Sequence, residues 1–326
     1  MKLNSNLTLL VGTLGVDNQN FDKFDRQCSE MKELGYYGVY FNNIFFTMED
    51  VNFNCAEEDI LFREDKCLIV RRSEDDLKQV KKIIEAHDLP MPSAHFLNLL
   101  PEPGCAPESI FGTHEKILDI AEFMGAKRVT THIGSIAVPT IAKAKTRPTP
   151  AEKLANREIT FPEYTELLNA NYGIEKIISD SLIVYKHLCN EAEKRGIKVT
   201  IETACGYRPL AKSAELIIDF IDKVGANNLG ICIDSGHCHM YGLDTEDFVR
   251  KCGSYFLETH FHDNFGKKDR HNPIGIGTIN WLETIKAMKE INYQGEITFE
   301  QGDYVTNYKN WMLLIKQVEM DLNKND

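Results

Sequence analysis

The chain has 326 residues, of which 43% are hydrophobic, and its formal net charge is −12 at pH 7. This length suits a single α/β barrel domain over residues 1–326, and the hydrophobic share is sufficient for a full core. The acidic balance argues against a nucleic-acid or anionic-membrane partner, because phosphate-rich surfaces attract basic proteins.

The cysteines and the N-terminal residues indicate the compartment. Nine cysteines occur without regular spacing and without a CxxC pair, which is typical of free thiols in a reducing environment. The first residues, MKLNSNLTLLVGTLG, favour a first strand over a signal peptide. No apolar stretch approaches the roughly 20 residues that a membrane span needs. We therefore expect a cytoplasmic protein without a membrane segment.

Strand-type and helix-type segments alternate eight times along the chain. The expected strands, in chain order, are Leu7–Val11, Gly38–Phe41, Pro92–Phe96, Arg128–His132, Lys198–Glu202, Leu229–Asp234, Phe256–His262 and Glu296–Glu300. Amphipathic stretches lie between them, and no glycine-rich phosphate fingerprint follows the first strand, which disfavours a dinucleotide-binding fold. The pattern predicts an α/β protein with a closed (β/α)8 TIM barrel.

Two connections are longer than a barrel requires. Asn43–Ile69 follows the second strand, is rich in acidic residues and reads as a loop, and Ser135–Ala170 follows the fourth strand. Both are enlarged βα loops, so we expect them to lie over the catalytic face as a lid or a partner surface. The second loop is long enough to dock a small partner subunit.

Metal-type ligands stand at the ends of four expected strands: Glu202, Asp234, His260 and Glu300. Period-two alternation places these side chains on the inner face, and the C-terminal ends of barrel strands converge on one rim. Carboxylates that cluster in this way repel one another unless a cation neutralises them. Three carboxylates and one imidazole favour Mn²⁺, with Mg²⁺, Co²⁺ or Zn²⁺ as further options.

Other polar residues follow the same strand ends. We expect them to bind substrate, to orient the ligands or to hold a further metal ion. His262 is also an alternative to His260 as a ligand, because the two share a strand face. These residues are His95, His132, His237, His262, Asp263, Asp269 and His271.

The chain resembles the xylose isomerase-like superfamily of barrels over essentially the whole barrel, most specifically in its second half. The similarity is carried by the run HFHDNFGKKDRHNPIGIGTINWLETIKAMKEINYQGEITFE, by IETACGY and ICIDSGH, and by MKELGYYGVYFN in the first half. The superfamily contains sugar isomerases and epimerases, inosose dehydratase and endonuclease IV. The resemblance implies Glu202, Asp234, His260 and Glu300 as metal ligands, with Glu202 and Glu300 as the proton-transfer pair.

The expected function is a metal-dependent sugar or polyol isomerase or epimerase that abstracts a proton next to a carbonyl. An inosose-type dehydratase and a C-glycoside-cleaving lyase use the same first step and remain alternatives. A homo-oligomer also remains open.

A zinc phosphodiesterase resembling endonuclease IV is the alternative of another class. That enzyme binds three zinc ions through nine ligands, and this chain has matching residue types at His95, His132, Glu202, Asp234, His237, His260, Asp269, His271 and Glu300. The acidic balance and the lack of arginine-rich loops argue against a nuclease.

Overall fold

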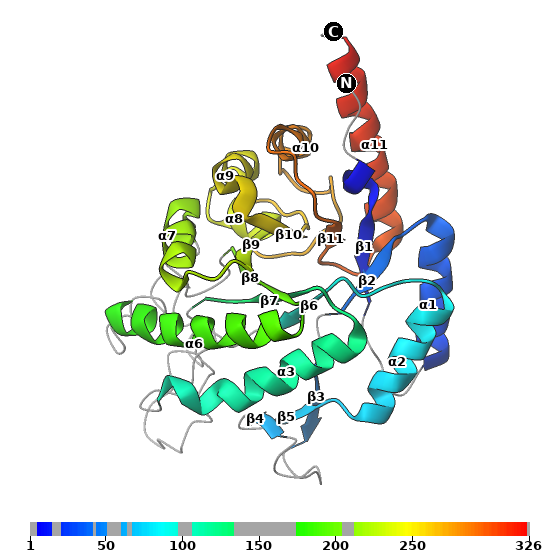
Figure 1. The fold of residues 1–326 in the computed structure, drawn as a ribbon. Coiled ribbons are helices and arrows are strands. Elements are labelled where there is room, and N and C mark those ends of the chain that lie inside the picture. The colour runs from blue at the N-terminus through cyan, green and yellow to red at the C-terminus, as the bar shows by residue number, and fades with distance from the viewer. Residues whose placement is uncertain are drawn as a thin grey trace, which may run out of the picture.

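The computed structural model describes residues 5–14, 21–41, 44–50, 60–63, 67–96, 106–133, 174–203 and 212–324. Within these ranges, eight parallel strands form a barrel that is surrounded by helices (Figure 1). The barrel strands are β1 Leu10–Thr13, β2 Gly38–Tyr40, β6 Ser93–Phe96, β7 Arg128–Thr131, β8 Lys198–Glu202, β9 Leu229–Asp234, β10 Phe256–His260 and β11 Ile297–Phe299.

Helices follow the strands and cover the outside of the barrel (Figure 1). The α-helices are α1 Phe21–Leu34, α2 Glu74–Ala86, α3 Phe111–Met124, α6 Ile174–Lys194, α7 Ala214–Val224, α8 Ser235–Met240, α9 Thr245–Cys252, α10 Trp281–Glu290 and α11 Tyr304–Asn323. Short 3-10 turns are η1 Ser5–Thr8, η3 Pro107–Ile110 and η5 Gly253–Tyr255.

The barrel closes through two irregular seams between its regular ladders. The strands pair in the orders β11-β1-β2 and β10-β9-β8-β7-β6. At one seam, the Phe261 amide donates to the carbonyl of Thr298 at 2.8 Å, and the Glu300 amide donates to the carbonyl of Phe261 at 3.1 Å. At the other seam, the Val39 amide donates to the Pro90 carbonyl at 3.0 Å. The preceding Gly38 is required there, because a Cβ atom would lie 2.5 Å from the same oxygen.

An aromatic cluster holds the first seam against the helices. The Phe261 ring lies 5.2 Å from Trp281 of α10, and the Phe299 ring lies 5.7 Å from Trp311 of α11, measured between ring centroids. Because side chains alternate along an extended chain, His260 and His262 on either side of Phe261 face the barrel interior. The packing of this seam therefore positions two imidazoles at the rim.

The first strand begins at Leu10, three residues after its predicted start at Leu7. Ser5–Thr8 forms the 3-10 turn η1, and β1 begins at Leu10. Leu7 is buried, and its carbonyl accepts a 2.9 Å hydrogen bond from Nε1 of Trp311. The apolar character of this residue thus reflects packing against α11, which a pattern of apolar residues cannot distinguish from a strand.

The expected loop Asn43–Ile69 instead contains strands. β3 Phe46–Asp50, β4 Ile60–Arg63 and β5 Cys67–Arg71 form an antiparallel sheet in which β5 is central. Aromatic and β-branched residues supply the strand preference that the acidic composition obscured. The sheet lies apart from the barrel, between β2 and α2 in the chain (Figure 1), so the enlarged βα connection itself is present. Ser135–Ala170 lies outside the described residues.

Two further sequence expectations concern thiols and membrane spans. The described part of the chain contains five buried free cysteines, Cys28, Cys189, Cys232, Cys238 and Cys252. Among the described helices, none is both long and apolar enough to cross a bilayer.

Candidate active site at the barrel rim

Four strand ends bring three carboxylates and one imidazole together. Glu202, Asp234 and His260 are the last residues of β8, β9 and β10, and Glu300 follows β11 directly. All four side chains are buried, and one ligand atom of each lies within 4.8 Å of the others. We call these residues the oxygen-rich group.

Glu202 is surrounded by three imidazoles. Its Oε1 lies 3.0 Å from Nδ1 of His260, and its Oε2 lies 2.9 Å from Nε2 of His95. Oε2 also contacts Nε2 of His132, which in turn lies 3.0 Å from Nε2 of His95. Complete burial acts to raise the pKa of Glu202, but His132, His95 and His260 hold it well below its usual range.

Asp234 both ends β9 and begins α8. One carboxylate oxygen accepts a 2.7 Å hydrogen bond from the backbone amide of His237, as an N-cap residue does. Its backbone amide donates to Oγ1 of Thr203 at 2.8 Å. Burial acts to raise the pKa of Asp234, and the neighbouring His237 and His262 lower it overall. The carboxylate is therefore fixed at the rim by the strand-to-helix turn.

Glu300 has a buried carboxylate oxygen, Oε2, without a hydrogen bond to any described residue. Burial, together with the charges of Glu202 and Asp234, raises the pKa of Glu300 despite the nearby imidazoles. A buried oxygen without a hydrogen bond, in a set of three carboxylates and one imidazole, fits a divalent cation of the Mn²⁺ or Mg²⁺ type.

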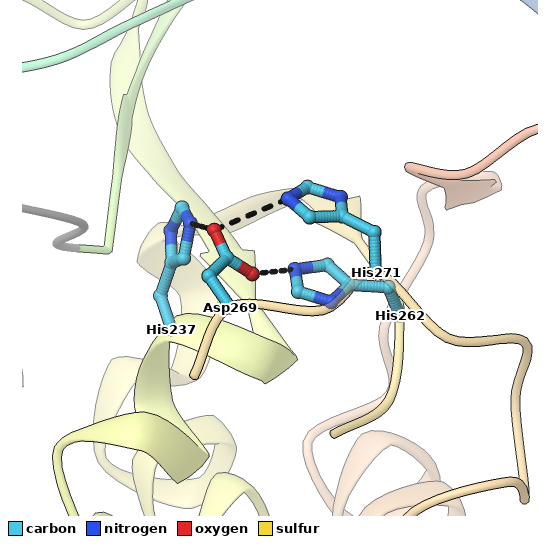
Figure 2. Close-up of side chains that lie close together, drawn as sticks. All are labelled: His237, His262, Asp269 and His271. Carbon is cyan, nitrogen blue, oxygen red and sulfur yellow. Dashed lines mark hydrogen bonds and ion pairs between the residues drawn. The ribbon is translucent and has the colours of Figure 1, made fainter. Parts of the chain in front are cut away.

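A second group lies beside the first and is rich in imidazole (Figure 2). Asp269 Oδ2 lies 3.2 Å from Nε2 of His237 and 3.1 Å from Nε2 of His271, and Asp269 Oδ1 lies 3.6 Å from Nε2 of His262. We call these four residues the imidazole-rich group. Burial acts to lower the pKa of His271, but the hydrogen bond to Asp269 and nearby carboxylates raise it to about 10.

Asp263, which we expected at the substrate or behind the ligands, makes its contacts with the loop that leads to α10. Its Oδ2 accepts hydrogen bonds from the Gly275 amide at 3.0 Å and from Nε1 of Trp281 at 2.8 Å. Its Oδ1 accepts from the amides of Asn264 and Ile279 at 2.9 and 3.3 Å. Asp263 therefore organises this loop.

Sequence reasoning missed two residues inside the barrel. The Tyr40 ring on β2 is buried 5.0 Å from the His260 ring, between centroids. Glu258 is fully buried on β10 and accepts hydrogen bonds from the hydroxyls of Ser93 and Thr298 at 3.0 and 2.8 Å. Its signal was available, because Glu258 and His260 are two residues apart and so share a strand face.

The fold and the rim define an α/β barrel with a buried carboxylate and imidazole centre. Residues 47–317 match the family model described as the xylose isomerase-like TIM barrel, and the chain belongs to this family.

Curated relatives match parts of the chain. It is 31% identical to an uncharacterized protein of Methanocaldococcus jannaschii over 50% of this chain and 56% of the relative. It is 28% identical to D-psicose 3-epimerase of Enterocloster bolteae over 35% of this chain and 37% of the relative. An inosose isomerase of Bacillus subtilis is 26% identical over 39% of this chain and 48% of the relative. The matches thus span about half or less of the length of these relatives.

Solved structures of low identity share the fold. D-allulose 3-epimerase from Methylomonas sp. has a TM-score of 0.62 at 14% identity, covering 97% of this chain and 99% of the other. The 3-keto-D-glucoside 4-epimerase of E. coli has a TM-score of 0.57 at 15% identity, covering 94% of this chain and 98% of the other. These likenesses establish the barrel architecture.

Proposed function

We propose that this chain is a sugar or polyol epimerase or isomerase that depends on a divalent cation, with Mn²⁺ as the favoured ion. The observation that carries the proposal is the convergence of Glu202, Asp234, His260 and Glu300 at the barrel rim. The partial similarity to D-psicose 3-epimerase and inosose isomerase supports the same class of reaction.

In this proposal the oxygen-rich group holds the cation and two of its carboxylates move protons. The bound cation supplies a Lewis acid that draws electron density from the substrate carbonyl. Glu202 and Glu300 come from separate strands, and each has a carboxylate at the shared centre. One removes the proton from the carbon next to the carbonyl, and the other returns a proton to the substrate. His95 and His132 hold Glu202 in place through their contacts with its Oε2.

The experiment follows hydrogen exchange next to the carbonyl. The protein is incubated in D₂O with Mn²⁺ and a panel of ketoses, aldoses and inososes, and the α-hydrogen signal is monitored by NMR. We expect the wild type to exchange this hydrogen in at least one substrate. Glu300→Gln should slow the exchange by about 10²–10⁴-fold, the usual contribution of a general acid or base.

Glu319→Gln makes the same replacement on α11, outside the rim, and serves as the matched control. Thermal unfolding shows that each variant folds. Full exchange in a folded Glu300→Gln variant would remove Glu300 from the mechanism. The products also separate the alternatives, since a dehydratase or a C-glycoside-cleaving lyase releases water or an aglycone after the same proton is removed.

A zinc phosphodiesterase resembling endonuclease IV is the second candidate function. One specific observation favours it: the nine matching residues form a connected set of contacts across the oxygen-rich group, the imidazole-rich group, His95 and His132. The net charge of −12 opposes it, because a DNA backbone requires a basic surface. Incubation with a duplex that carries an abasic site tests this candidate, and cleavage at that site would displace the epimerase proposal.

A further inference from the structure

We propose that the hydroxyl of Tyr40 is a catalytic donor, which hydrogen-bonds to a substrate oxygen beside Glu300 while the proton next to the carbonyl is moved. This inference rests on the proposed function and adds a residue to it. Tyr40 is the last residue of β2, and its side chain is completely buried. Within the described part of the chain, its hydroxyl has no hydrogen-bond partner.

The first argument is the level of Tyr40 in the barrel. Tyr40 pairs with Thr13 of β1. The residue before Thr13, Gly12, pairs with Phe299 of β11. Glu300 is the next residue, so Tyr40 and Glu300 stand at the same level, with only β1 between their strands. Tyr40 therefore belongs to the layer of side chains in which the oxygen-rich group lies.

The second argument is that Tyr40 and Glu300 lie against the same two imidazoles. The Tyr40 ring is 5.0 Å from the His260 ring and 6.5 Å from the His95 ring, measured between centroids. The carboxylate of Glu300 approaches the same rings. Its Oε2 lies 3.8 Å from Nδ1 of His260, and its Oε1 lies 3.6 Å from Nδ1 of His95. The phenol and the carboxylate are therefore neighbours around one pair of rings inside the barrel.

The third argument is that an unused donor and an unused acceptor occur together here. The Tyr40 hydroxyl and Oε2 of Glu300 are both buried, and neither has a hydrogen-bond partner among the residues that the structure describes. A buried polar atom without a partner lowers stability, so a native protein keeps few of them outside functional sites. A substrate oxygen that enters beside Glu300 would give the phenol the acceptor that it lacks.

The chemistry of a phenol suits this task. Its O–H group is protonated at neutral pH and donates a hydrogen bond. Complete burial raises the pKa of Tyr40 well above its usual value, and the charges of Glu300 and Glu202 raise it further. The proton is therefore retained beside two carboxylates. When the proton next to the carbonyl leaves, negative charge develops on the neighbouring substrate oxygen, and a fixed donor at that point stabilises this charge.

The test replaces Tyr40 with phenylalanine, which removes the hydroxyl and keeps the ring against His260. Exchange of the substrate α-hydrogen in D₂O, followed by NMR at several substrate concentrations, gives kcat and KM. We expect kcat to fall by about 10²–10³-fold, the usual loss when one such donor is removed, while KM stays near the wild-type value. The manganese content after desalting should match the wild type, because Tyr40 is not a ligand.

A second measurement uses the protein without metal or substrate. If the Tyr40 hydroxyl has no protein partner, Tyr40→Phe removes an unpaired buried group and should melt at the wild-type temperature or above it. Tyr36→Phe is the matched control. Tyr36 is also buried, but it precedes β2, and its hydroxyl donates to the carbonyl of Tyr304 at 2.7 Å. That variant should melt at a lower temperature and keep the wild-type kcat.

A loss of kcat in Tyr40→Phe without a loss of melting temperature supports the inference. Two results would overturn it and leave the proposed function standing. One is a wild-type kcat in folded Tyr40→Phe. The other is a fall in melting temperature as large as that of Tyr36→Phe, which would reveal a protein partner for the Tyr40 hydroxyl. Absence of exchange in the wild type with every sugar would instead remove the proposed function, and this role with it.

Discussion

At the residue scale, Asp263 shows how a carboxylate near a candidate active site can serve the loop instead of the chemistry. Its two oxygens accept hydrogen bonds from three backbone amides and from the Trp281 indole. Gly277 lies directly against this carboxylate, and a Cβ atom there would be 2.1 Å from Asp263 Oδ1. The loop after β10 is thus built around one buried acidic side chain.

Replacing Asp263 with asparagine should destabilise the protein. The amide group would put a donor where an oxygen now accepts, and at least one buried N–H would lose its partner. We expect a loss of about 1–3 kcal/mol in the free energy of unfolding, measured by urea denaturation with tryptophan fluorescence as one probe. Asp247→Asn on the exposed surface of α9 should change it by less than about 0.5 kcal/mol. Equal stability of the two variants would contradict this role.

At the element scale, the packing of α3 on β6 buries a histidine outside the rim. His114 of α3 is buried against Phe96 of β6, with ring centroids 5.9 Å apart. Neither ring nitrogen has a hydrogen-bond partner among the described residues. Burial, with a smaller contribution from the charge of His187, lowers the pKa of His114 from 6.5 to about 3.

This histidine should make the stability sensitive to acid. Between pH 6.5 and about 3 the unfolded chain binds a proton at His114 that the folded chain does not bind, so stability falls as the pH falls. His114→Leu should therefore lose stability less steeply over this window, by up to about 1.4 kcal/mol per pH unit. Urea unfolding at several pH values measures the slope. His87→Leu, at a partly exposed site, is the control, and equal slopes for His114→Leu and wild type would refute the assignment.

The elements differ in how far the sequence could predict them. The strands that end at Glu202 and Asp234 were predicted with their observed bounds, because turn residues flank runs of β-branched residues there. The barrel class followed from the alternation of strand-type and helix-type segments, and the gathering of the strand-end carboxylates and imidazole followed from the alternation of side chains along each strand. The sheet β3–β5 was missed because its strands are short and lie in a segment whose overall composition is acidic. The 3-10 turn η1 was missed because Leu7 is apolar for a tertiary reason, its packing against α11. The contacts of Asp263 depend on where a loop folds back, which local patterns do not contain.

At the scale of the whole molecule, an ion pair inside the barrel connects strands below the rim. Arg128 at the start of β7 donates to the carboxylates of Glu258 on β10 and Glu296 before β11. Glu258 also accepts from hydroxyls on β6 and β11. Burial acts to lower the pKa of Arg128, but the two carboxylates raise it, so the guanidinium stays charged. The pair thus joins strands on both sides of the closing seam.

Replacing one member of this ion pair should lower the free energy of unfolding more, per residue changed, than replacing both members together. Arg128→Met or Glu258→Leu alone leaves a buried group without its main partner, which typically costs about 3–5 kcal/mol. The double variant should be more stable than the sum of the single losses predicts, by at least about 1 kcal/mol. Urea unfolding of the four proteins measures this coupling. Strict additivity would mean that the two side chains stabilise the barrel independently.

The close approach of α8 to the segment after β10 has a consequence for how this site can vary. A Cβ atom on Gly236 would lie 1.9 Å from Cε1 of His262, so the imidazole occupies the space of the missing side chain. Positions 236 and 262 are therefore expected to covary: a relative with an imidazole at the second position should have glycine at the first. A larger residue at position 236 would mark a divergent branch with a differently built rim.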